Sequence, residues 1–209
     1  MLGRLAGELP RGLPRAAFLL NQQACMLGAL AAVGVPPCAT LSAATEAHAG
    51  ALAAFVDEVM EAHLRGYSGW VKRVVGDTAR ELAALPGGYP GGKEALSNPK
   101  QLLSGLPEGF KPPMNLAEAE AAVRDLDASW KGALAAISGE VDRYFGAGKL
   151  PREVIRACFS EVAEFQQRGV ALLGRVFPPS AGTPPAWARD MTSLQSMYFE
   201  MRRYGRSEA

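Results

Sequence analysis

The chain has 209 residues and a mass of 22.1 kDa, and its 48% apolar and 21% charged content is typical of a folded globular protein. Twenty-two basic residues against 21 acidic ones give a net charge of +1, so no global field attracts it to nucleic acid or anionic lipid. Three cysteines, Cys25, Cys38 and Cys158, are odd in number and lack CxxC spacing. This argues against a disulfide scaffold or a zinc site and favours a reducing compartment, with no cofactor expected.

The first 33 residues predict a leader followed by a helix. Residues 1–13, with Pro10 and Gly12, are expected to be disordered. Three arginines before an apolar run resemble a targeting segment, but Asn21-Gln22-Gln23 interrupts the run and helical spacing continues beyond it. We therefore expect an ordinary helix from Pro14 to about Val33. No stretch approaches 18 uninterrupted apolar residues, so no transmembrane helix is expected.

The next segment predicts a long amphipathic helix that the rest of the chain packs around. Thr40 or Ser42 would cap it, and its apolar stripe continues to Leu85. A helix of about 45 residues would extend for roughly 70 Å, and three glycines are places where it could bend or break. The stripe consists of Leu52, Phe55, Val56, Val59, Met60, His63, Leu64, Tyr67, Trp70, Val71, Val74 and Val75, and the glycines are Gly66, Gly69 and Gly76.

Residues 86–114 are rich in proline and glycine and predict a long loop, with one short turn around Lys100–Ser104. Its PGGYPGG run lacks the GxxxxGK[ST] ending and no strand precedes it, which argues against a nucleotide site.

Three further helices are expected in residues 115–209. Asn115 would cap the first, with Glu118 completing a near capping box, and Gly146 and Gly148 would end it. Pro151 would open the second. The third would start at about Trp187, with inward residues Met191, Leu194, Met197, Tyr198, Met201 and Tyr204.

No period-2 segment of convincing length occurs, so the predicted fold is all-α: an elongated antiparallel bundle of about five main helices. Its two helical parts, 14–85 and 115–209, would belong to one rod or to two stacked bundles.

No catalytic constellation or metal ligand set is recognisable, and we expect a protein that is not an enzyme. His48 and His63 lie four turns apart and cannot share a metal, and the acidic pairs fall on predicted solvent faces. Trp70, Trp130 and Trp187 are interpreted as core anchors, and Cys158 as a small hydrophobic residue.

The last helix carries the candidate partner contacts, Tyr198, Arg202, Arg203 and Tyr204, in which arginines and tyrosines alternate. They suit an acidic partner or a membrane. A solvated helix end, where cations complement the helix dipole, is the alternative interpretation.

Several blocks of sequence resemble, in order, the C-terminal region of the vacuolar protein sorting-associated protein fifty-two family. These blocks are Phe18-Leu19-Leu20-Asn21, Met26-Leu27-Gly28-Ala29-Leu30, FVDEVMEAHLRGYSGWVKRV at Phe55–Val74, Ser129-Trp130-Lys131 with Tyr144-Phe145, Phe165-Gln166-Gln167 through Phe177, and Leu194 to Arg203. The chain departs from the family at Gln22-Gln23-Ala24, in the expanded loop at 86–113 and in the RRYGRSEA tail. The family's N-terminal coiled coil has no counterpart, so the chain resembles a C-terminal portion.

The resemblance implies a non-enzymatic subunit of the Golgi-associated retrograde protein complex, shared with the endosome-associated recycling complex. Such tethers capture endosome-derived vesicles at the trans-Golgi network through SNAREs and Rab-family GTPases. The implied partners are other tether subunits, a Rab and SNAREs, without nucleic acid, and the implied location is cytoplasmic, peripheral on Golgi and endosome membranes.

Two other functions stay open at this point. One is a small ligand-binding or enzymatic bundle with a cavity between the helices bearing His63, Trp130 and Cys158. The other is a self-associating coiled-coil scaffold, which the interrupted, non-heptad pattern disfavours.

Overall fold

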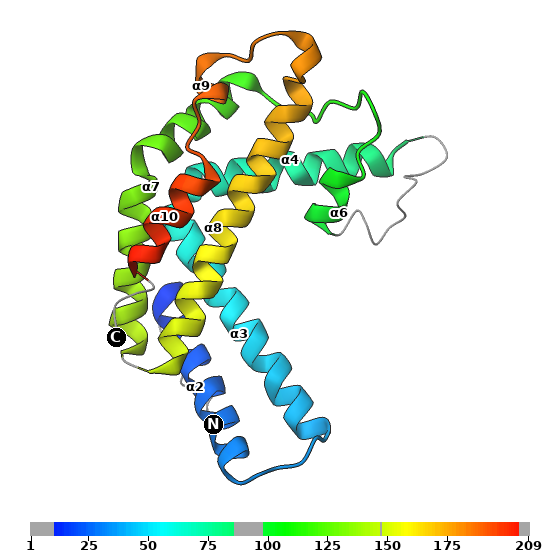
Figure 1. Cartoon of the computed structure of the whole chain (residues 1–209). Coiled ribbons are helices and arrows are strands. Elements are labelled where there is room, and N and C mark those ends of the chain that lie inside the picture. Colours follow the sequence, from blue (N-terminus) through cyan, green and yellow to red (C-terminus); the bar gives the residue numbers. More distant parts are fainter. Residues whose placement is uncertain (1–10, 86–97, 147, 205–209) are drawn as a thin grey trace. The chain divides into compact units, whose positions relative to one another are not determined.

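The computed structural model describes residues 11–85, 98–146 and 148–204, and every regular element within these ranges is a helix (Figure 1). The predicted all-α class is therefore confirmed. The predicted leader up to residue 10 and residues 86–97 of the Pro/Gly-rich loop lie outside the described residues. None of the helices in the described ranges is long and apolar enough to cross a membrane. The elements are α2 Leu13–Ala32, α3 Ala39–His63, α4 Arg65–Ala83, α6 Pro99–Ser104, α7 Leu116–Phe145, α8 Lys149–Val176, the 3₁₀ turn η1 Pro179–Ala181, α9 Ala186–Arg189 and α10 Leu194–Tyr204.

The chain forms two compact units that interleave in sequence. Unit 1 comprises residues 1–63, 132–161 and 201–209, and unit 2 comprises residues 64–131 and 162–200. Segments from both halves of the chain thus contribute to each unit.

Unit 1 is built on the antiparallel pair α2 and α3, which Figure 1 shows joined by a short connection. The Phe55 ring lies edge-on to the rings of Tyr144 and Phe145, with centroids 6.3 and 4.9 Å away. The Asn21 amide donates a hydrogen bond to the Tyr144 backbone carbonyl at 3.2 Å. These contacts fasten the hairpin to the end of α7 through both apolar and polar groups. The core of the unit includes Leu20, Val59, Met60, Ile137, Val141, Val154 and Cys158.

Unit 2 has a core in which α4 meets α8 at very short range. The Tyr67 and Trp70 rings lie 5.5 Å apart, and α8 presents Gly169 to them. A Cβ at position 169 would lie 2.9 Å from Tyr67 Cζ and still closer to the Tyr67 hydroxyl, so no side chain fits without displacement. Glycine is required here for close packing of an aromatic residue.

Two predicted helices begin and end almost where the sequence places them. Pro14 lies in the first turn of α2, and Val33 and Gly34 follow its last residue. At the start of α7 the Asn115 side chain accepts a hydrogen bond from the Ala117 backbone N–H at 2.9 Å. Gly146, with φ of 61°, follows its end. Local signals therefore define these termini.

The predicted helix from about residue 40 to Leu85 is interrupted beside Gly66, one of the three glycines at which a bend or break was expected. α3 ends at His63, Leu64 has φ −134° and ψ 22°, and α4 begins at Arg65. Leu64 is buried, and a Cβ at Gly66 would lie 2.6 Å from Asp125 Oδ2. The close approach of α7 to Gly66 is a tertiary contact that the amphipathic pattern could not reveal.

The close packing at Gly169 gives a first prediction. We expect Gly169→Ala to lower the free energy of unfolding by about 1–3 kcal/mol, because the new methyl group must push the buried Tyr67 ring aside. The measurement is urea unfolding followed by circular dichroism.

Gly174→Ala is the matched control on the same helix, because a Cβ there meets nothing within 4 Å. It should raise stability by about 0.5–1 kcal/mol through helix propensity. Equal stabilisation by both substitutions would contradict the described packing.

Candidate functional site

Helix α10 divides cleanly into a buried side and an exposed side. Met197 and Met201 are buried, and the carboxylate-bearing Glu200 is buried with them. The α10 outer face is defined as Gln195, Tyr198, Phe199, Arg202 and Arg203, and Ser196 is also exposed in the first turn of the helix. The helix therefore packs through methionines and turns aromatic and cationic groups outward.

Tyr198 and Phe199 are the two exposed aromatic residues in the part of the chain that the structure describes. Phe199 has 73% of its surface exposed and Tyr198 has 45%. Water contact with so much aromatic surface is unfavourable, so the two adjacent rings are a candidate interaction surface.

The four predicted contact residues do not all share this face. Tyr198, Arg202 and Arg203 lie on it, whereas Tyr204 is half-buried and its ring packs edge-on against Phe159 at 6.1 Å. Tyr198 was also predicted to face inward, and this is wrong, because the structure places it among the exposed residues.

Phe199 was missed by the sequence analysis, which assigned the neighbouring Tyr198 to the inward stripe and did not consider Phe199. Residues 194, 197, 201 and 204 complete the inward stripe at spacings of three and four, and this leaves Phe199 opposite to it. That spacing, applied strictly, was the signal that could have found it.

The predicted fifth helix from about Trp187 is two separate helices, which is a further correction. α9 covers Ala186–Arg189, and α10 begins only at Leu194. Ser193 Oγ accepts a hydrogen bond from the Ser196 backbone N–H at 3.1 Å, which makes Ser193 the N-cap of α10. Serine capping therefore fixes the residue at which the outer face starts.

The turn before α10 is anchored by polar side chains from two other helices of unit 2. Asp127 Oδ1, on α7, accepts hydrogen bonds from the Thr192 backbone N–H at 2.8 Å and from the Thr192 hydroxyl at 2.6 Å. The Gln166 amide, on α8, donates a hydrogen bond to the Thr192 carbonyl. Both backbone polar groups of Thr192 are satisfied by side chains, so this turn has a defined position relative to α7 and α8 within the unit.

The anchor extends into the core through Tyr67 on α4. The Tyr67 hydroxyl donates to Gln166 Oε1 at 3.0 Å, and Gln166 is only 1% exposed. Burial first, and the negative charge of Asp127 second, raise the pKa of Tyr67 well above its ordinary value of 10.0. The hydroxyl therefore remains a neutral donor at physiological pH.

The residues of the proposed ligand-binding alternative are distributed over both units. His63 and Cys158 belong to unit 1, and Trp130, which is buried, belongs to unit 2. Burial raises the pKa of the Cys158 thiol to about 12, with a smaller opposing effect of a backbone hydrogen bond. Cys158 is therefore protonated at neutral pH and is not an activated nucleophile.

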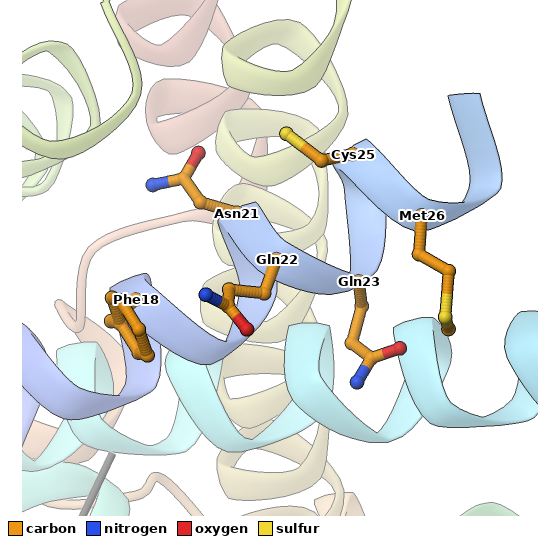
Figure 2. Close-up of a pocket in the computed structure, with 6 residues that line it drawn as sticks. All are labelled: Phe18, Asn21, Gln22, Gln23, Cys25 and Met26. Carbon is orange, nitrogen blue, oxygen red and sulfur yellow. The ribbon is translucent and has the colours of Figure 1, made fainter. Parts of the chain in front are cut away.

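A pocket of about 580 Å³ lies on α2, away from these three residues in sequence, and Phe18, Asn21, Gln22, Gln23, Cys25 and Met26 line it. Figure 2 shows Gln23 and Met26 extending toward α3, and Asn21 and Cys25 extending away from it. Gln23 Oε1 is buried and has no hydrogen-bond partner among the described residues. The lining contains no Asp, Glu, His, Lys or Arg, so it offers amide hydrogen bonds, apolar contact and the free thiol of Cys25.

No family model, no curated protein and no solved structure matches this chain. The resemblance to the vacuolar protein sorting-associated protein fifty-two family therefore stays a prediction. Within the described residues, no group of three or more His, Cys, Asp or Glu side chains is arranged to hold a metal ion.

The raised pKa of Tyr67 gives a second prediction, with a defined sign. The unfolded chain loses the Tyr67 proton near pH 10, whereas the folded chain keeps it to higher pH. The stabilisation is therefore fully present below about pH 10 and is lost progressively as the pH rises above it, by up to roughly 1.4 kcal/mol per pH unit.

Urea unfolding at about pH 8 and about pH 11 measures this effect. Tyr67→Phe should be less stable than the parent by about 1–3 kcal/mol at pH 8, because Gln166 Oε1 loses its buried donor. The difference in the free energy of unfolding between the two proteins should shrink at pH 11. Titration of the other tyrosines and of the lysines affects both proteins equally and does not change this difference. A difference that stays constant or grows with pH would contradict the buried hydrogen bond.

Proposed function

We propose that this chain is a non-enzymatic subunit of a vesicle-tethering complex and that it docks another protein on the α10 outer face. The observation that carries the docking role is the pair of adjacent exposed aromatic rings, Tyr198 and Phe199, one turn before Arg202 and Arg203. Aromatic residues and arginine are the residue types most enriched at the energetically dominant positions of protein interfaces.

The anchoring of α10 supports docking as well. An interface residue contributes most when its position is fixed before binding, because less conformational entropy is then lost. Asp127 and Gln166 hold the turn at Thr192, and Ser193 caps the helix, so Tyr198 and Phe199 are presented by a structured element.

The tethering identity is the finer part of the proposal, and the resemblance of the sequence blocks supports it. The complex that we propose is the Golgi-associated retrograde protein complex, acting in endosome-to-trans-Golgi transport. The partners would be other tether subunits, a Rab-family GTPase or SNAREs. Membrane association would be peripheral and indirect, through these partners.

Co-purification tests the function. Tagged full chain is incubated with Golgi-enriched cytosol, and retained proteins are identified by mass spectrometry. We expect the other tether subunits, or a Rab that is retained preferentially in its GTP state. Phe199→Ala should reduce their recovery about tenfold or more, since truncation of an aromatic hot spot costs roughly 2 kcal/mol of binding free energy.

The matched controls are Val170→Ala and Arg156→Ala, two exposed positions on α8. They should leave recovery unchanged. Equal recovery with the parent and Phe199→Ala would refute docking through α10. Absence of tether subunits, both with this chain and with a version extended upstream, would refute the tethering role.

A further inference from the structure

The charges of α10 are separated between its two sides. Its one acidic residue, Glu200, is buried on the inner side, while Arg202 and Arg203 are exposed on the outer face. The other described residues of this face are uncharged. The outer face therefore carries the exposed Arg202 beside two exposed rings, whereas Glu200 and Arg203 each interact within the chain.

Helix-end electrostatics explains only part of this pattern. Arginines at the C-terminal end of a helix are favourable for the helix itself, because they complement its dipole. That effect gives no reason to expose Tyr198 and Phe199 beside them, since an exposed phenylalanine costs solvation free energy without stabilising the helix. The combination of rings and cations needs a second explanation.

The geometry of the face fits a helical occupant. Tyr198 and Arg202 are four residues apart, as are Phe199 and Arg203, so two ring–cation pairs lie side by side along the helix. From Tyr198 to Arg203 the face extends for roughly 7–8 Å along α10, at 1.5 Å per residue. This length corresponds to about one and a half turns of a partner helix. A partner helix would cover the rings with an apolar stripe and meet Arg202 with an acidic side chain.

We propose that the α10 outer face binds an acidic amphipathic helix of a partner protein. The inference rests on the proposed docking role of α10, and it specifies the chemistry of the occupant. Tyr198 and Phe199 contact the apolar stripe of that helix, and Arg202 pairs with a flanking carboxylate. Arg203 already interacts within the chain and plays a secondary part.

Two synthetic peptides test the proposal. Each is an amphipathic helix of about 20 residues with the same leucine stripe. One carries glutamates beside the stripe, and the other carries lysines at the same positions. Fluorescence anisotropy measures the binding of each labelled peptide to the full chain.

We expect the glutamate peptide to bind about fivefold more tightly than the lysine peptide, the preference that one exposed ion pair can give. Arg202→Glu should abolish or reverse the preference, and Phe199→Ala should weaken both peptides. Arg156→Glu, at an exposed site on α8, should change neither. Raising the salt concentration from about 50 to about 500 mM should reduce the preference.

Three results would overturn the proposal. One is equal binding of the two peptides. Another is a preference that Arg202→Glu and Arg156→Glu alter equally. The third is tighter association with vesicles containing about 30% phosphatidylserine than with the glutamate peptide, which would make an anionic membrane the occupant. None of these results depends on recovery of tether subunits, so the occupant's chemistry and the tethering role can fail separately.

Discussion

The buried Tyr67 hydroxyl, which needs a hydrogen-bond partner, determines how α4, α8 and the turn before α10 are held together in unit 2. Tyr67 inserts its ring between α4 and α8, where Gly169 leaves room for it, and its hydroxyl reaches Gln166. An unpaired hydroxyl at this depth would cost roughly 1–3 kcal/mol. Gln166 satisfies it through Oε1 and uses its amide N–H on the Thr192 carbonyl. One buried side chain thus joins α4, α8 and the turn that leads into α10.

This arrangement connects core packing to the candidate docking surface. The buried hydrogen bond between Tyr67 and Gln166 fixes the position of the Gln166 side chain, which in turn binds the Thr192 carbonyl. Asp127, on α7, accepts two further hydrogen bonds from Thr192. Ser193 then caps α10, and Met197 and Met201 fix its rotation by burial. With the rotation fixed, Phe199 must face outward. The exposed rings are therefore a consequence of how the helix is anchored.

Local sequence signals were sufficient for the fold class and for most helix termini. Pro14, Asn115 and Gly146 act on their own neighbours, so their effects can be predicted without knowing the fold. The three glycines indicated that the long helix could bend or break, but they did not identify Leu64 as the residue at which it does.

The candidate site was predicted only in part, for a similar reason. Tyr198, Arg202 and Arg203 were identified from composition near the end of the chain, but Tyr204 packs against Phe159 and Phe199 was overlooked. Gln166 lies within an apolar stripe, and a single sequence does not show that a buried glutamine has partners at both ends.

The most direct test of docking on α10 is photo-crosslinking from a single position. A benzophenone amino acid replaces Phe199 in one protein and Val170, exposed on α8, in another. Each full chain is irradiated in Golgi-enriched cytosol, and crosslinked peptides are sequenced. The account predicts a specific crosslink from position 199, to an acidic helical segment of a tether-associated protein, and none from position 170. The same products from both positions, or no product from position 199, would contradict it.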